Sequence, residues 1–183
     1  ILEDLEEAEA EIMAFHCPHL VVTGGEPLLQ PKPLAKLLRS LRDNGVYAEI
    51  ETNGTIIPEP ALLDVVEQWN VSPKLANSGN SPAHSQFSQA LELFSQLQHA
   101  YFKFVIVEEE DLPEMLAMVD TYRVPSQRVI MMPEGTTPDR TWKWMVIKDG
   151  VLPESHIRAG RGEDLPFDDA SMDLVFTNGV VSN

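Results

Sequence analysis

Hydrophobic residues along the chain follow two alternating periods. Spacings of three and four residues, typical of one face of a helix, occur in residues 1–16, 32–45, 61–69, 87–97 and 112–123. Short runs of apolar and β-branched residues, typical of strands, lie at 19–23, 46–52, 70–74, 100–107 and 128–133. Strand and helix therefore alternate five times, which predicts right-handed βαβ units and a parallel sheet.

The length of the chain limits how that sheet can close. A closed eight-stranded α/β barrel needs about 250 residues, and the chain has 183. We therefore predict an α/β fold with an open, partial barrel over residues 1–141. The alternation does not continue cleanly after that point, so we treat residues 142–183 as a separate tail.

Composition narrows the class of protein. Apolar content of 43% and charged content of 23% are those of an ordinary globular domain. The net charge of −16 argues against a nucleic-acid partner, and no apolar run approaches the ~18 residues of a membrane span. The acidic start does not resemble a signal peptide, and the single cysteine, Cys17, excludes a disulfide framework. We therefore expect a cytoplasmic protein.

The polar segments that could carry chemistry follow the predicted strands. In "TGGEP" (23–27), glycines allow a ligand to approach the backbone, and a glutamate adds negative charge, a combination that suits a cationic amine. A plain strand-to-helix turn is the open alternative, with Pro27 and Pro31 setting the helix start.

Three further strand ends carry polar residues, each with an alternative structural interpretation. In "IETNGT" (50–55) four polar side chains crowd one strand end, although Asn53-Gly54 is also an ordinary turn. In "SPK" (72–74) a hydroxyl and an ammonium flank a proline and could bind a carboxylate or ribose hydroxyls, although a solvated Lys74 is also open. "MMPEG" (131–135) ends the last strand, and Lys103 could point to either side of its strand.

Together, in this order, "VVTGGEPLLQ", "IETNGT", "VSPKL", "FKFVIV" and "MPEGTT" resemble the radical S-adenosylmethionine enzymes. "TGGEP" alone points to that superfamily, and "ETNGT" followed by "SPK" is similar to the 7-carboxy-7-deazaguanine synthases within it. The resemblance covers roughly residues 1–140.

The resemblance implies a partial (β/α)6 TIM-like barrel and a carbon–nitrogen lyase of the queuosine and deazapurine pathway. Such an enzyme converts 6-carboxy-5,6,7,8-tetrahydropterin to 7-carboxy-7-deazaguanine and releases ammonia. It uses S-adenosylmethionine, a [4Fe-4S] cluster and Mg²⁺. The resemblance also implies a flavodoxin-type reductant, and it leaves open whether the protein forms a homodimer.

The resemblance also implies roles for individual positions. Residues expected to bind S-adenosylmethionine are Gly25, Glu26, Ser72, Pro73, Lys74, Met132, Pro133 and Glu134. Residues expected to face the pterin are Thr23, Glu51 and Asn53. It assigns no catalytic residue and no metal ligand within the chain.

The chain departs from the family in its cysteines. The family holds its cluster with a three-cysteine motif, CxxxCxxC or a variant, after the first barrel strand. Cys17 precedes "VVTGG" and is the chain's one cysteine, so we predict that it is a buried or half-buried small residue. We expect the first strand, the cysteine loop and the magnesium ligand upstream of Ile1, and no turnover from these 183 residues alone.

The tail resembles a different family. "GRGEDLPFDDASMDLVFTNGVV" is similar to the central part of a class I S-adenosylmethionine methyltransferase, at residues 162–167 and 173–175. The glycine-rich loop that would precede it is absent, and a solvated acidic turn is the alternative. We interpret the tail, in which residues 148–183 carry this resemblance, as a junction of two unrelated coding fragments or a misassembled reading frame. Alternative functions are a methyltransferase-type protein or a non-catalytic S-adenosylmethionine-binding protein.

Overall fold

The strands form a five-stranded sheet in a computed structural model that describes residues 4–78 and 84–133. Strand order follows the chain, β1-β2-β3-β4-β5, and the pairs β1–β2, β2–β3 and β4–β5 are parallel. The α/β fold with a parallel sheet predicted from the alternation is confirmed. The described chain splits into two compact units. The first consists of residues 4–72 and 84–101, and the second of residues 73–78 and 102–133.

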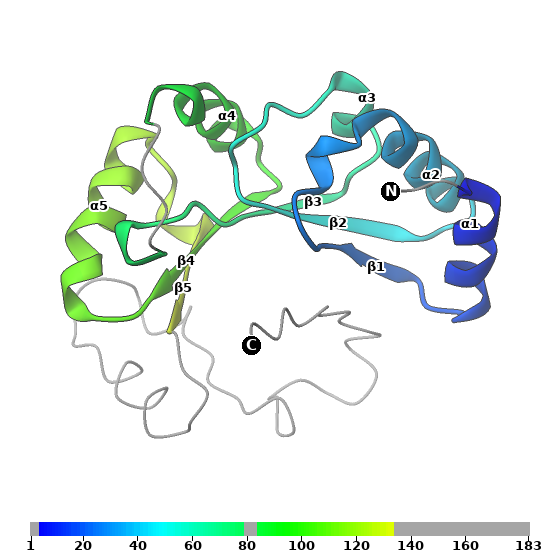
Figure 1. The fold of residues 1–183 in the computed structure, drawn as a ribbon, viewed down its shortest axis with the longest axis horizontal. Coiled ribbons are helices and arrows are strands. Elements are labelled where there is room, and N and C mark those ends of the chain that lie inside the picture. The colour runs from blue at the N-terminus through cyan, green and yellow to red at the C-terminus, as the bar shows by residue number, and fades with distance from the viewer. Residues whose placement is uncertain (1–3, 79–83, 134–183) are drawn as a thin grey trace. The chain divides into compact units, whose positions relative to one another are not determined.

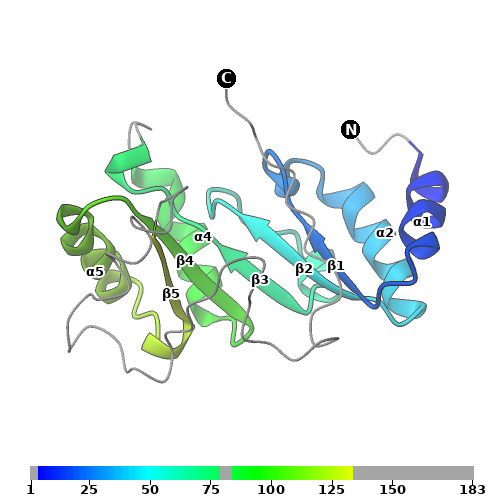
Figure 2. The same ribbon diagram turned by 90° about the horizontal axis from the view of Figure 1, so that it is seen from below.

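Three parallel strands and their helices build the first unit (Figure 1). Its elements are α1 (Leu5–Ala14), β1 (His19–Val22), η1 (Pro27–Leu29), α2 (Pro31–Asp43), β2 (Tyr47–Thr52), α3 (Pro60–Leu63), β3 (Gln68–Val71) and α4 (His84–Gln96). β1, β2 and β3 lie side by side and run in the same direction (Figure 2). Their carboxyl ends therefore meet at one edge of the sheet.

Helix α2 shows how the sequence specifies these elements. It begins with Pro31 in its first turn, where a missing N–H is harmless. It buries one apolar face, made of Leu34, Ala35, Leu37, Leu38 and Leu41. It ends before Gly45, whose φ of +83° is a conformation that favours glycine. The Ser40 hydroxyl then donates a 2.6 Å hydrogen bond to Glu9 and joins α2 to α1.

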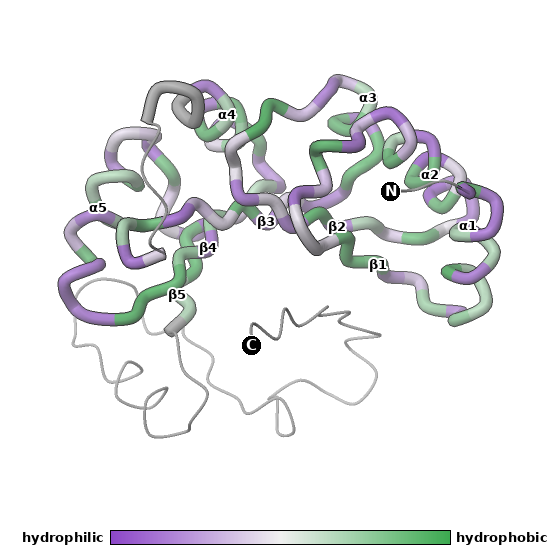
Figure 3. Tube along the Cα trace, viewed as in Figure 1, coloured by the Kyte–Doolittle hydropathy of each residue, from purple (hydrophilic) through white to green (hydrophobic). Residues whose placement is uncertain are grey.

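The two faces of β2 differ in polarity. Ala48, Ile50 and Thr52 are buried, whereas Glu49 and Glu51 between them are half-buried. β3 alternates in the same way, with Trp69 and Val71 on the buried face. β1 differs, because it is hydrophobic over most of its length (Figure 3) but all four of its residues are only half-buried.

A row of polar side chains, which we call the polar ladder, joins the three strands on the face opposite Ala48 and Trp69. Its members are His19 of β1, Glu49 of β2, and Gln68 and Asn70 of β3. Asn70 donates a 2.7 Å hydrogen bond to Glu49, and Gln68 donates a 3.0 Å bond to Asn70. His19 Nε2 lies 2.7 Å from Glu49 Oε1, in a contact that is not a hydrogen bond.

The second unit contains most of β4 (Ala100–Ile106), then η3 (Glu109–Asp111), α5 (Leu112–Thr121), η4 (Ser126–Arg128) and β5 (Val129–Pro133). β4 alternates throughout, with Phe102 and Phe104 fully buried and Lys103 half-buried on the other face. Lys103 therefore lies on the face of β4 opposite Phe102 and Phe104.

The helix predicted over residues 61–69 is wrong in its extent. α3 ends at Leu63, and β3 begins at Gln68. Trp69 belongs to that strand, where its ring is fully buried and packs on Phe94 with centroids 5.3 Å apart. A short apolar run satisfies both periods, and burial against α4 decides for the strand.

Several predicted segments lie outside the described residues. They include the tail predicted from residue 142 onward, the methyltransferase-like residues 162–167 and 173–175, and Glu134.

Candidate functional site

The segment between β1 and η1 forms an open backbone turn. Gly24 has a φ of +96° and Gly25 a φ of +57°. Among the described residues, beyond each glycine and its chain neighbours, no atom lies within 4 Å of the place where either would carry a Cβ. Glycine is therefore required here by the backbone conformation and not by crowding. The space beside both residues is free for another molecule to approach the backbone.

Glu26 ties this turn to the end of the neighbouring strand. Its Oε1 accepts hydrogen bonds from the Thr52 hydroxyl at 2.9 Å and from the Leu28 amide at 3.2 Å. Its Oε2 accepts one from the Asn53 amide at 2.9 Å. A carboxylate offers about four acceptor positions, so one on Oε2 remains for a further donor.

The residues predicted to face the substrate lie at the same sheet edge. The Thr23 hydroxyl, just after β1, donates a 3.0 Å hydrogen bond to Glu51 Oε2 on β2. The Asn53 side chain accepts a 2.9 Å bond from the Thr55 amide, so the turn interpretation of Asn53-Gly54 is also correct. Thr23, Glu51 and Asn53 therefore follow or end adjacent parallel strands, and each already makes a contact within the protein.

The "SPK" residues follow β3 and are divided between the two units. The Ser72 amide donates a 2.7 Å bond to the Thr52 carbonyl, which places Ser72 at the edge that carries Glu26. Pro73 is buried and Lys74 exposed, and both belong to the second unit. In that unit Met132 and Pro133 end β5, with Met132 41% exposed.

A clamp around Asp111 holds the chain just beyond Lys74. Asp111 Oδ2 accepts hydrogen bonds from the Asn77 side chain at 2.7 Å and from the Val107 and Glu108 amides at 2.8 and 3.1 Å. Burial alone would raise the pKa of Asp111, but these hydrogen bonds outweigh burial and lower it below its ordinary value. The anchored segment includes η2 (Ala76–Ser78), whose first amide donates to Glu114.

Cys17 is half-buried, as predicted, and its thiol donates a 3.1 Å hydrogen bond to the His19 carbonyl. Within residues 4–78 and 84–133, no three His, Cys, Asp or Glu side chains are grouped to hold a metal ion. The same part of the chain contains no helix with the length and apolar character of a membrane span.

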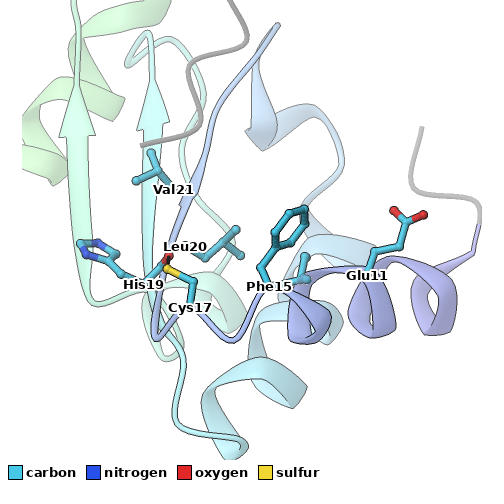
Figure 4. Close-up of a pocket in the computed structure, with 7 residues that line it drawn as sticks. Glu11, Phe15, Cys17, His19, Leu20 and Val21 are labelled. Atoms are coloured by element: carbon cyan, nitrogen blue, oxygen red, sulfur yellow. Dashed lines mark hydrogen bonds between the residues drawn. The ribbon is translucent and has the colours of Figure 1, made fainter. Parts of the chain in front are cut away.

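A hollow of about 350 Å³ lies away from the predicted site, between α1 and β1 (Figure 4). Its lining is mostly apolar and consists of Glu11, Ile12, Phe15, Cys17, His19, Leu20 and Val21. Phe15 is 60% exposed there. Sequence reasoning predicted the burial of Cys17 but no binding site on this surface.

Two residues of the site, Thr52 and Gly54, were noted in the sequence but were given no role at the site. Thr52 is only 3% exposed, and its hydroxyl accepts a 3.1 Å bond from the Gly54 amide while donating to Glu26. Gly54 has a φ of +74°, and an added Cβ would lie 2.6 Å from Leu91. The available signal was that Thr52 shares the buried face with Ile50, since side chains alternate along a strand.

Relatives among characterised proteins resemble this chain over most of its length. It is 36% identical over 166 residues to the 7-carboxy-7-deazaguanine synthase of Pyrobaculum aerophilum, covering 85% of this chain and 71% of that protein. It is 32% identical to the enzyme of the same name from Hyperthermus butylicus, covering 74% of this chain and 57% of that one. No family model matches the chain.

Solved structures give the same result for the fold. The crystal structure of QueE from Escherichia coli matches with a TM-score of 0.53 and 26% identity, over 76% of this chain and 57% of that one. Archaeal TYW1 matches with a TM-score of 0.51 and 16% identity, which supports the fold alone. The fold is thus a TIM-like partial barrel of the radical S-adenosylmethionine type, and the chain spans little more than half of either structure. The chain belongs to the 7-carboxy-7-deazaguanine synthase family of radical S-adenosylmethionine enzymes.

Proposed function

We propose that the protein acts as a radical S-adenosylmethionine carbon–nitrogen lyase. Its substrate is 6-carboxy-5,6,7,8-tetrahydropterin, and its products are 7-carboxy-7-deazaguanine and ammonia. Family membership supports the reaction. The geometry of Gly24, Gly25 and Glu26 is the observation that supports the cofactor's position.

This geometry fits the methionine end of S-adenosylmethionine. Gly24 and Gly25 lack side chains and face open space, so a ligand can reach their backbone. Glu26, the residue after Gly25, retains an acceptor position on Oε2. A cationic ammonium is the donor that a carboxylate binds most strongly, so we place the methionyl ammonium at Gly25 and Glu26.

The remaining assignments follow the strand ends. From the family resemblance we assign Ser72, Pro73, Lys74, Met132, Pro133 and Glu134 to cofactor binding. Thr23, Glu51 and Asn53 face the pterin. The Thr23 hydroxyl holds Oε2 of Glu51, which orients this carboxylate to accept N–H groups of a pterin ring.

The iron–sulfur cluster and the magnesium ion that the family uses require metal ligands, which are distinct from the residues assigned to S-adenosylmethionine. A [4Fe-4S] cluster, when bound, supplies the electron that starts the chemistry. Cys17 is the one thiol in these 183 residues, and the described part contains no grouped metal ligands. These residues therefore do not fit the cluster, and we derive no step through it. The family also suggests a flavodoxin-type reductant, a homodimer and a cytoplasmic location.

Calorimetry tests the cofactor site. The folded protein should bind S-adenosylmethionine, and Glu26→Gln should weaken that binding about tenfold, the contribution of one charge-assisted hydrogen bond. Methylthioadenosine, which lacks the ammonium, is the matched control and should bind both proteins equally. An absence of heat with S-adenosylmethionine, from protein with a folded circular dichroism spectrum, would refute the proposal.

A further inference from the structure

We propose that Thr52 is a positioning residue for the Gly24-Gly25 turn and that it acts through Glu26. The inference rests on the proposed function, because it assumes that the turn holds the cofactor's methionine end. Thr52 itself is 3% exposed and lies beneath the strand end. It is therefore out of reach of a ligand.

The direction of the Thr52 hydroxyl is fixed by its two partners. The Gly54 amide donates to its oxygen at 3.1 Å, so the single hydroxyl proton points to Glu26 Oε1 at 2.9 Å. This arrangement delivers a donor to Glu26 in a buried position, where hydrogen bonds are stronger than in water. Thr52 is also the one polar residue buried among the described residues.

Glu26 in turn connects the segment that follows the glycines to the end of β2. The same carboxylate accepts from the Asn53 amide, at the end of β2, and from the Leu28 amide, at the start of η1. Gly24 and Gly25 have no side chains through which the protein could hold them. Their backbone therefore depends on anchors on either side, which are the Thr23–Glu51 bond and Glu26.

Removing the Thr52 hydroxyl should therefore alter the proposed cofactor site without removing any direct contact to the ligand. Thr52→Val keeps the branched shape but removes the donor to Glu26 and the acceptor for Gly54. Oε1 then keeps one donor, from Leu28, and the carboxylate is free to rotate away from Asn53. Thr52→Ser keeps both hydrogen bonds and is the matched control.

Amide hydrogen exchange and calorimetry on the full chain test this inference. In Thr52→Val the Leu28 and Asn53 amides should exchange faster, although both donate to Glu26 and neither is hydrogen-bonded to the Thr52 side chain. S-adenosylmethionine should bind about tenfold more weakly. Methylthioadenosine should bind as to wild type, and Thr52→Ser should stay within twofold of wild type. A purely structural role would instead weaken both ligands alike.

The possible failures can be distinguished. If wild type binds S-adenosylmethionine and Thr52→Val binds it equally well, the inference is overturned while the proposed function stands. If wild type shows no binding, the proposed function fails and the inference fails with it. Should Thr52→Val not fold, Glu26→Asp, too short to reach both Thr52 and Asn53, must give the same weaker binding. Unchanged binding in that variant also overturns the inference.

Discussion

Gly54 and Leu91 are packed so closely that no side chain fits between them. An added Cβ at Gly54 would lie 2.6 Å from Leu91 Cδ2 and 2.9 Å from Val71 Cγ1. Gly54 also has a φ of +74°, which L-residues adopt at a cost. The end of β2 thus depends on glycine for two independent reasons.

Gly54→Ala should therefore lower the free energy of unfolding by about 2–4 kcal/mol, from backbone strain plus overpacking. Gly45→Ala is the matched control, because Gly45 has a φ of +83° but open space around it. It should lose only about 1 kcal/mol. Urea unfolding followed by circular dichroism measures both, and equal losses would show that the contact with Leu91 is unimportant.

The hydrogen bonds to Asp111 should make the free energy of unfolding depend on pH in the acidic range. Its hydrogen bonds lower the pKa of Asp111 in the folded protein, so the stabilisation is complete above the unfolded pKa of about 3.9. It is lost as the pH falls through the folded pKa. The urea midpoint of Asp111→Asn should therefore lie below that of wild type at pH 6 and approach it near pH 2.

Asp120→Asn, at an exposed position of α5, is the control for that measurement and should follow wild type at every pH. A constant difference between wild type and Asp111→Asn across the pH range would contradict the assignment.

Glu49 is the central member of the polar ladder. Its side chain is 13% exposed and contacts His19 of β1 and Asn70 of β3. Glu49→Ala should cost about 1–3 kcal/mol, because it leaves a half-buried amide without its acceptor. In a double-mutant cycle with Asn70→Ala, the coupling energy should be about 0.5–3 kcal/mol. Additive losses would mean that the two residues act independently.

The phenol of Tyr47 should ionise at a higher pH than that of an ordinary tyrosine. Burial raises the pKa of its phenol, as do the nearby charges of Glu49, Glu67 and Tyr101. An absorbance titration should show a phenol ionising above about pH 10, and Tyr47→Phe should remove that step. Because the pKa of Tyr47 is raised in the folded protein, the neutral phenol favours the folded state relative to the ionised phenol. This contribution to the free energy of unfolding is complete below about pH 10 and is lost as the pH rises through the folded pKa of Tyr47.

Glu49→Gln should move the Tyr47 titration back toward the ordinary range, since it removes one of those charges. Glu92→Gln, at an exposed position of α4, should leave it unchanged. A titration that does not respond to Glu49→Gln would show that the charge of Glu49 does not contribute to the raised pKa of Tyr47.

The sequence was sufficient for the parallel sheet, because each strand and helix carries its own period. It misassigned residues 61–69, where Val65, Val66 and Trp69 fit either period and only tertiary packing decides. It also located the strand ends that meet near Glu26. It could not show that the Glu26 carboxylate is bound by Thr52 and Asn53. These partners are separated from Glu26 by 26 and 27 positions along the chain, so the contacts depend on the tertiary fold.

The position of half-buried β1 at the end of the described sheet leads us to expect that self-association of the chain depends on salt. At the end of the described sheet, an apolar strand beside a hollow is a template for pairing with another strand. A net charge of −16 opposes such encounters through mutual repulsion. Salt screens that repulsion over about 10 Å at 0.1 M. Purification in concentrated salt should therefore promote self-association of the chain, and dilute buffer should keep its copies apart.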